Sequence, residues 1–175
     1  EEKGVKVLNS EEELKSLTSG TVIIRAHGVG EKVYGLLKQQ GVNLVDATCP
    51  FVLKIHNIVR KESEAGKNII IIGNGNHPEV EGIMGWAKGP AFVVESAEEI
   101  EKIPLKQDST LCIVSQTTFN YKKFKELVEI FEKKGSYKNE THDTTKVYDY
   151  KALYEGLRLA GEQCQENEKN RCIDR

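Results

Sequence analysis

Short apolar runs and longer amphipathic runs alternate along the first 136 residues of the chain. The short runs are rich in β-branched residues, which favours strands, whereas the longer runs place apolar residues at helical spacing. Strands are therefore predicted at residues 21–28, 42–49, 68–75, 91–96 and 110–118, and helices at residues 11–17, 31–41, 50–66, 78–87, 97–103 and 121–135. Repeated strand–helix units indicate an α/β fold with parallel sheets and right-handed crossovers.

Several local signals support these boundaries. Ser10 is a plausible N-cap with Glu13 three residues later, and Gly41 and Gly66 stand where two helices should stop. The run "NIIIIG" has no polar alternation, which predicts a strand buried on both faces. We expect four parallel strands within residues 68–118, together with the strand near 43–48, and helices on both faces of the sheet.

Three segments follow from this pattern. Residues 1–48 are predicted to be a partial first α/β unit, and residues 49–136 a complete second unit. No strand is evident after residue 118. Residues 137–175 combine a polar loop with an amphipathic stripe, so they are predicted to form a divergent, mainly helical tail.

Composition narrows the class of protein. With 38% hydrophobic and 30% charged residues and a net charge of −2, the 175-residue chain resembles a soluble globular protein, and we expect neither nucleic acid nor membrane as a partner. The opening has no basic start or apolar core like those of a signal peptide, so we expect a cytoplasmic or plastid-stromal location and reduced thiols. Cys112, inside "TLCIVS", is expected to be a core residue.

Unusual polar residues follow four of the predicted strands, and ligands of parallel sheets bind beyond the carboxyl ends of the strands. These residues include His27, Cys49, the pair His77 and Glu79, and Thr117. Each signal is weak alone, because a loop histidine or a strand-end threonine is commonly a plain surface residue. Their recurrence at one sheet edge predicts a functional site.

Cys49 precedes Pro50, which is a favoured first-turn residue of a helix. The thiol would then lie at a helix N-terminus, where the dipole favours the reactive and metal-binding thiolate. A half-buried cysteine that merely packs is an equally good interpretation. Local features leave both open.

His77 and Glu79 flank Pro78 at the start of a helix. Capping explains a histidine poorly, because Ser, Thr, Asn and Asp are better caps, so we favour a site that binds an anion and moves protons. His56 is expected to be solvated on the polar side of its helix, and no role is assigned to His142.

Four strings, in this order and spacing, resemble the 4-hydroxy-3-methylbut-2-enyl diphosphate reductase family: "IRAHGV", "DATCPFV", "GNGNHPEVEGIMGW" and "VSQTT". This family contains the iron–sulfur oxidoreductases that end the methylerythritol phosphate route of isoprenoid biosynthesis. The resemblance covers about residues 1–136. It implies a trefoil of three α/β units around a 4Fe–4S cluster, a small-molecule diphosphate substrate, and reduced ferredoxin or flavodoxin as electron donor.

The resemblance also implies roles for individual residues. Cys49 matches a cluster ligand, and His27 and His77 match histidines that hold the substrate diphosphate. Glu79 matches the acid that relays protons to the leaving hydroxyl, and Thr117 matches the threonine beside the substrate alcohol. The implied reaction is a reductive dehydroxylation that yields isopentenyl or dimethylallyl diphosphate.

The chain departs from the family pattern at both ends. The family's N-terminal cluster cysteine and a further diphosphate histidine have no counterpart, and Cys164 and Cys172 stand in a different context from the third cluster cysteine. We therefore expect an incomplete version that folds, binds diphosphate weakly and turns over little by itself. Two alternatives remain open: a non-catalytic α/β module, or a metal-dependent hydrolase using His27, His77 and Glu79.

Overall fold

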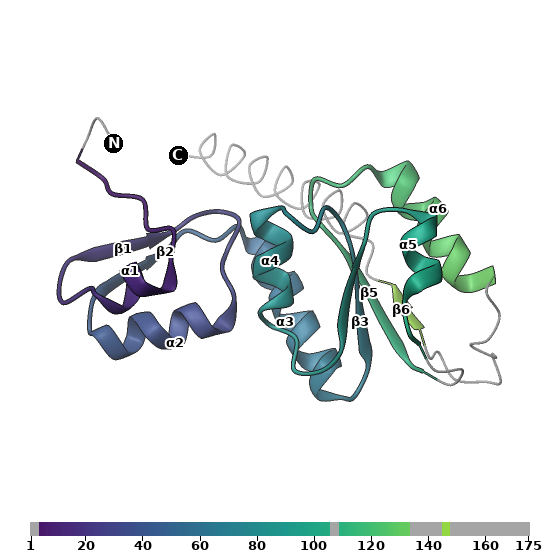
Figure 1. Ribbon diagram of the computed structural model, residues 1–175, viewed down its shortest axis with the longest axis horizontal. Coiled ribbons are helices and arrows are strands. Elements are labelled where there is room, and N and C mark those ends of the chain that lie inside the picture. Colours follow the sequence, from purple (N-terminus) through teal and green to yellow (C-terminus); the bar gives the residue numbers. More distant parts are fainter. Residues whose placement is uncertain (1–3, 106–108, 134–144, 148–175) are drawn as a thin grey trace, which may run out of the picture.

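The computed structural model describes residues 4–105, 109–133 and 145–147 (Figure 1). Its strands are β1 (Thr21–Ile24), β2 (Asn43–Asp46), β3 (Asn68–Ile72), β4 (Ala91–Val94), β5 (Leu111–Ser115) and β6 (Thr145–Val147). Its helices are α1 (Glu11–Lys15), α2 (Glu31–Gln40), α3 (Pro50–Glu64), α4 (Pro78–Met84), α5 (Ala97–Lys102) and α6 (Tyr121–Lys133). Every strand pairing among them is parallel, which confirms the predicted α/β class.

The strands form two sheets. β1 and β2 pair only with each other, and together with α1 and α2 they make what we call the smaller unit. The larger unit comprises α3 to α6 and a four-stranded sheet with the order β4-β3-β5-β6. Figure 1 shows α3 and α4 on one face of this sheet and α5 and α6 on the other.

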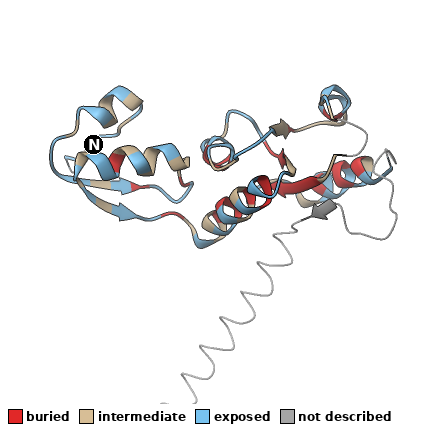
Figure 2. Cartoon of the chain, turned by 90° about the horizontal axis from the view of Figure 1, so that it is seen from below, coloured by how far each residue is buried: buried red, intermediate tan, exposed pale blue. Residues whose placement is uncertain are grey.

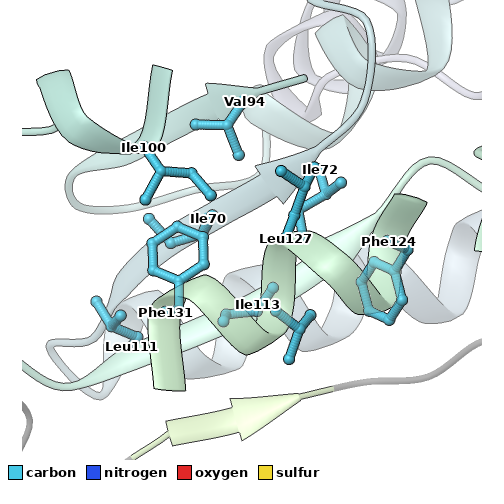
Figure 3. Close-up of a cluster of buried hydrophobic side chains, with 10 residues drawn as sticks. Ile70, Ile72, Val94, Ile100, Leu111, Ile113, Phe124, Leu127 and Phe131 are labelled. Atoms are coloured by element: carbon cyan, nitrogen blue, oxygen red, sulfur yellow. The ribbon is translucent and has the colours of Figure 1, made fainter. Parts of the chain in front are cut away.

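The core lies on both faces of β3, as the uninterrupted isoleucines predict. Ile69 and Ile71 belong to the cluster beneath α3 and α4, whereas Ile70 and Ile72 belong to the cluster beneath α5 and α6. The second cluster includes Phe124, Leu127 and Phe131 of α6 (Figure 3). Since successive strand side chains point to opposite faces, four buried isoleucines in a row require cover on both sides.

The predicted caps are present. Ser10 accepts a hydrogen bond from the backbone N–H of Glu13, and the Glu13 carboxylate accepts one from the N–H of Asn9, 2.8 Å away. Gly41 and Gly66 follow α2 and α3 with positive φ values of 65° and 85°, a conformation that glycine adopts at little cost.

Three details of the predicted architecture are wrong. Residues 68–118 contain three strands rather than four, and the strand at 43–46 pairs with β1 in the smaller sheet instead of joining the larger one. A strand also exists after residue 118, because β6 pairs with β5. Its three residues, "TKV", form no apolar run, so only the pairing with β5 reveals it. The predicted tail helix lies outside the described residues.

No helix among the described residues has the length and apolar character needed to cross a membrane.

Candidate functional site

The larger sheet has a topological switch point between β3 and β5. These strands are neighbours, but the chain leaves β3 through α4 on one face and leaves β5 through α6 on the other. The two loops therefore diverge beyond the carboxyl ends of the strands, which is where ligands of open α/β sheets bind. Glu79 follows β3 and Thr117 follows β5, so they lie on opposite sides of this point.

Glu79 and Thr117 are joined across the switch point by two hydrogen bonds. The backbone N–H of Thr117 donates to Oε1 of Glu79 at 2.6 Å, and its hydroxyl donates to Oε2 at 2.8 Å. Glu79 is only 2% exposed, whereas Thr117 is exposed. The pair thus links a buried carboxyl group to the surface through one hydroxyl.

His77 is the N-cap of α4, which contradicts our argument that it caps poorly. Its Nδ1 accepts a hydrogen bond from the backbone N–H of Glu79 at 3.1 Å. A neutral imidazole that accepts at Nδ1 carries its proton at Nε2. Capping and ligand binding are therefore compatible, since the cap fixes the ring and leaves an N–H donor on its other side.

His27 comes from the smaller unit, on the turn that follows β1. Its ring meets the ring of His77 edge to face, with centroids 5.4 Å apart and an interplanar angle of 73°. His27 is exposed and His77 is partly buried. The structure thus brings His27, His77, Glu79 and Thr117 together from three separate segments.

Cys49 lies at the end of β2 as the N-cap of α3, and Pro50 follows it as the sequence predicts. It is a free, partly buried cysteine, and its backbone N–H donates to the carbonyl of Ala26 at 3.0 Å. Cys49 is therefore linked to the turn of His27 through a backbone hydrogen bond to the preceding residue. Cys112 is fully buried in the core, as expected.

The structure describes one partly exposed thiol at a helix N-terminus, a setting that suits a thiolate ligand. Within residues 4–105, 109–133 and 145–147, however, no three or more His, Cys, Asp or Glu side chains are grouped to hold a metal ion. Cys49 is therefore suited to a single metal–thiolate bond, and the described residues around it hold no complete ligand set.

Gln116 is a residue of the site to which the sequence analysis assigned no role. It is buried, its Oε1 accepts from the N–H of Asn74 at 3.2 Å, and its side-chain amide donates to Thr118 at 2.8 Å. It therefore ties the loop after β3 to the loop after β5. A glutamine directly after an apolar strand was the only signal for it in the sequence.

His56 is not solvated, contrary to expectation. It is 1% exposed and stacks on Trp86 with ring centroids 5.2 Å apart. Burial lowers its pKa to about 4, although the nearby Asp46 carboxylate opposes that shift. The helical pattern of α3 could not reveal this burial, because the covering residues come from other segments.

Comparison with known proteins identifies relatives over most of the chain. The sequence pattern of the family described as LytB protein matches residues 1–149. A 4-hydroxy-3-methylbut-2-enyl diphosphate reductase of Caldanaerobacter subterraneus is 44% identical over 135 residues, and one of Thermoanaerobacter sp. is 47% identical over 133 residues. These matches cover 77% and 75% of this chain but only 46% and 45% of the relatives, so the chain spans less than half of their length.

Solved structures give the same result. A Plasmodium falciparum E-1-hydroxy-2-methyl-but-2-enyl-4-diphosphate reductase superposes with a TM-score of 0.68 at 26% identity, covering 76% of this chain and 40% of that one. An (E)-4-hydroxy-3-methyl-but-2-enyl diphosphate reductase superposes with a TM-score of 0.60 at 35% identity, covering 73% and 43% of the two chains.

Proposed function

Because the chain belongs to the LytB family, we propose that it forms the part of a 4-hydroxy-3-methylbut-2-enyl diphosphate reductase that binds the substrate diphosphate and delivers the proton. The observation that carries this proposal is the adjacency of the His27–His77 pair and the Glu79–Thr117 pair at the sheet's switch point. The first pair suits an anion, and the second suits a proton transfer. The names of the relatives supply the substrate class.

His27 and His77 would bind the diphosphate. The cap bond at Nδ1 leaves the Nε2–H of His77 to donate to a phosphate oxygen, and the exposed ring of His27 meets that of His77 edge to face. The N-terminus of α4 adds a favourable dipole for a negative charge, although this helix is short.

Glu79 and Thr117 would handle the proton. The reaction removes the substrate hydroxyl as water, so a proton must reach that oxygen. A protonated Glu79 would donate to the Thr117 oxygen through Oε2, and the Thr117 hydroxyl would then donate outward. The buried position of Glu79 excludes bulk water from its carboxyl group, so the exposed hydroxyl is its route to a ligand.

Cys49 would supply one thiolate to a 4Fe–4S cluster, and the described residues contain no complete ligand set. When bound, such a cluster would supply the electrons of the reductive dehydroxylation. Reduced ferredoxin or flavodoxin is the proposed donor of those electrons, and we propose a cytoplasmic or plastid-stromal location. Because the chain covers less than half of its relatives, we expect little turnover from it alone.

Calorimetric titration with inorganic diphosphate tests the binding half of this proposal. We expect weak binding that His27→Ala and His77→Gln each reduce by about ten-fold, roughly one charge-assisted hydrogen bond. Lys38→Gln, which removes a charge at the exposed far end of α2, is the matched control and should leave binding unchanged. Unaltered binding in both histidine variants would refute the proposed diphosphate site.

A turnover assay with dithionite and a viologen, after anaerobic reconstitution with iron and sulfide, tests the remaining half. We expect the chain alone to retain little iron and to turn over little, and Cys49→Ser to reduce the retained iron further. Robust turnover by the chain alone would show that thiolates outside the described residues complete the cluster site.

A further inference from the structure

The turn that carries His27 runs along helix α4 in direct backbone contact. A Cβ atom added to Gly85 would lie 2.5 Å from the Cα of Gly30, so these two glycines touch backbone to backbone. The N–H of Glu31 donates to the carbonyl of Gly85 at 3.3 Å, and Gly82 lies beside the carbonyl of His27. α4 therefore carries His77 as its N-cap and contacts the turn of His27 along its length.

Trp86, which follows α4, is hydrogen-bonded to the same turn. Its indole N–H donates to the carbonyl of Val29 at 2.9 Å, two residues after His27. The ring is itself held by three neighbours: His56 stacked on one face, Tyr34 at its edge and Arg60 at 5.8 Å from its centroid. The turn and the tryptophan thus form one packed assembly.

His56 lies beneath the turn at its tightest point. A Cβ atom on Gly28 would lie 2.6 Å from Cε1 of His56 and 3.0 Å from a methyl carbon of Thr48. Gly28 also has a φ of +70°, which disfavours other residues at this position. His56 therefore forms the surface against which the turn rests.

Both ring nitrogens of His56 are buried and have no hydrogen-bond partner among the described residues. Burying unpaired polar atoms costs free energy, so an apolar residue of fitting shape would be more stable. An unsatisfied polar group in a native core calls for an explanation. The explanation that the contacts support is shape: a flat five-membered ring fits between the indole of Trp86 and the backbone of Gly28.

We propose that His56 is a positioning residue, whose ring, stacked on Trp86, supports the Gly28 turn along α4 and thereby sets His27 against His77. The proposal deepens the proposed function, because it rests on these two histidines being the diphosphate ligands. A six-membered ring at position 56 would push the turn outward, since there is no room for even one methyl group at Gly28. A smaller side chain would leave the turn unsupported.

His56→Phe tests this directly, with two readouts. We expect the affinity for inorganic diphosphate to fall about ten-fold or more, as displacement of a binding group by about an ångström does. The second readout needs no ligand: the chain has four histidines, so their ring signals are few in an NMR spectrum. In the parent protein, His77→Gln should shift the His27 ring signal, because the rings meet at 5.4 Å. In the His56→Phe protein that shift should be lost.

Phe131→Leu is the control for a general loss of stability, because Phe131 is buried on the opposite face of the larger sheet with α5 and α6. It should lower the unfolding midpoint and leave both readouts unchanged. If His56→Phe does not fold, His56→Gln takes its place, since it is smaller and loses the stacked ring.

The outcomes separate the two proposals. Retained affinity and a retained His27 shift in the His56 variants, or an equal loss in Phe131→Leu, would overturn the positioning role. If the parent chain binds no diphosphate, the proposed diphosphate site is refuted. The shift of the His27 ring signal in the NMR spectrum then tests the positioning role of His56 by itself.

Discussion

The larger and smaller units place very different fractions of their residues in a core. Every residue of β5 and all four isoleucines of β3 are buried, whereas the smaller unit has only Ile24 and Leu37 in its buried hydrophobic set (Figure 2). Ile23 and Val45, which pair with each other on one face of the smaller sheet, remain 59% and 44% exposed. The larger unit thus has a core of its own, and the smaller unit depends on contacts beyond its two strands.

The site, in contrast, draws on both units. Glu79, Thr117 and His77 belong to the well-packed larger unit, but His27 and the backbone partner of Cys49 belong to the smaller one. Stability and function are therefore separable. Changes where the turn after β1 packs against α4 and Trp86, which we call the junction, should disturb the site more than the fold. Changes in the core of the larger unit should do the reverse.

The largest expected effect comes from the core of the larger unit. Ile71→Ala removes a fully buried side chain and should lower the free energy of unfolding by about 2–5 kcal/mol. The same substitution at Ile23, which is 59% exposed, should cost less than about 0.5 kcal/mol. Urea unfolding of the two variants measures the difference. Equal losses would mean that the exposed face of β1 is covered in solution.

Acid should lower the stability of the protein by protonating His56, which lies at the junction. Because burial lowers the pKa of His56 from 6.5 to about 4, the folded state binds fewer protons than the unfolded state between these values. The stability from neutral His56 is fully present above about pH 6.5 and is lost as the pH falls toward 4, by up to about 3 kcal/mol. Unfolding curves of the parent and His56→Gln should converge over this window. Parallel curves would show that His56 titrates normally.

A glycine pair compares the junction with an open helix surface. Gly85→Ala drives a methyl group onto the backbone of Gly30 and should cost about 1–3 kcal/mol. Gly35→Ala, inside α2 with no atom within 4 Å of the added carbon, should instead stabilise by about 0.5–1 kcal/mol. Thermal unfolding measures both. A neutral Gly85 variant would indicate that the two units separate readily.

The smallest effect is expected from the ion pair that spans the junction between Lys88 and Glu31. Both side chains are more than a third exposed, at 42% and 35%, so Lys88→Met should cost less than about 1 kcal/mol. The loss should vanish at high salt, where screening removes the attraction. A larger or salt-independent effect would mean that the pair is an essential link between the units.

Features that depend on neighbouring residues in the chain were predictable. The helix starts at Ser10 and Pro50, the glycine stops at Gly41 and Gly66, and the doubly buried isoleucines of β3 each follow from a few adjacent letters. The proximity of His77 to Glu79 is equally local, because they begin the same helix. The position of Glu79 and Thr117 beyond neighbouring strand ends followed from the parallel topology, which the alternation of elements already implied. The expected single sheet edge was wrong for His27 and Cys49, because they follow strands of the smaller sheet.

Features that depend on distant segments were not predictable from local pattern. The sequence of β6 resembles a loop because it has no apolar run. It is a strand through its pairing with β5. Helical spacing on α3 could not show that His56 is buried, because the turn at Gly28 and the indole of Trp86 bury it. Whether His27 meets His77 depends on two glycines, Gly30 and Gly85, that let backbones touch across 55 residues of chain. Short-range periodicity specifies each element, but only the packing of one element against another brings these side chains together.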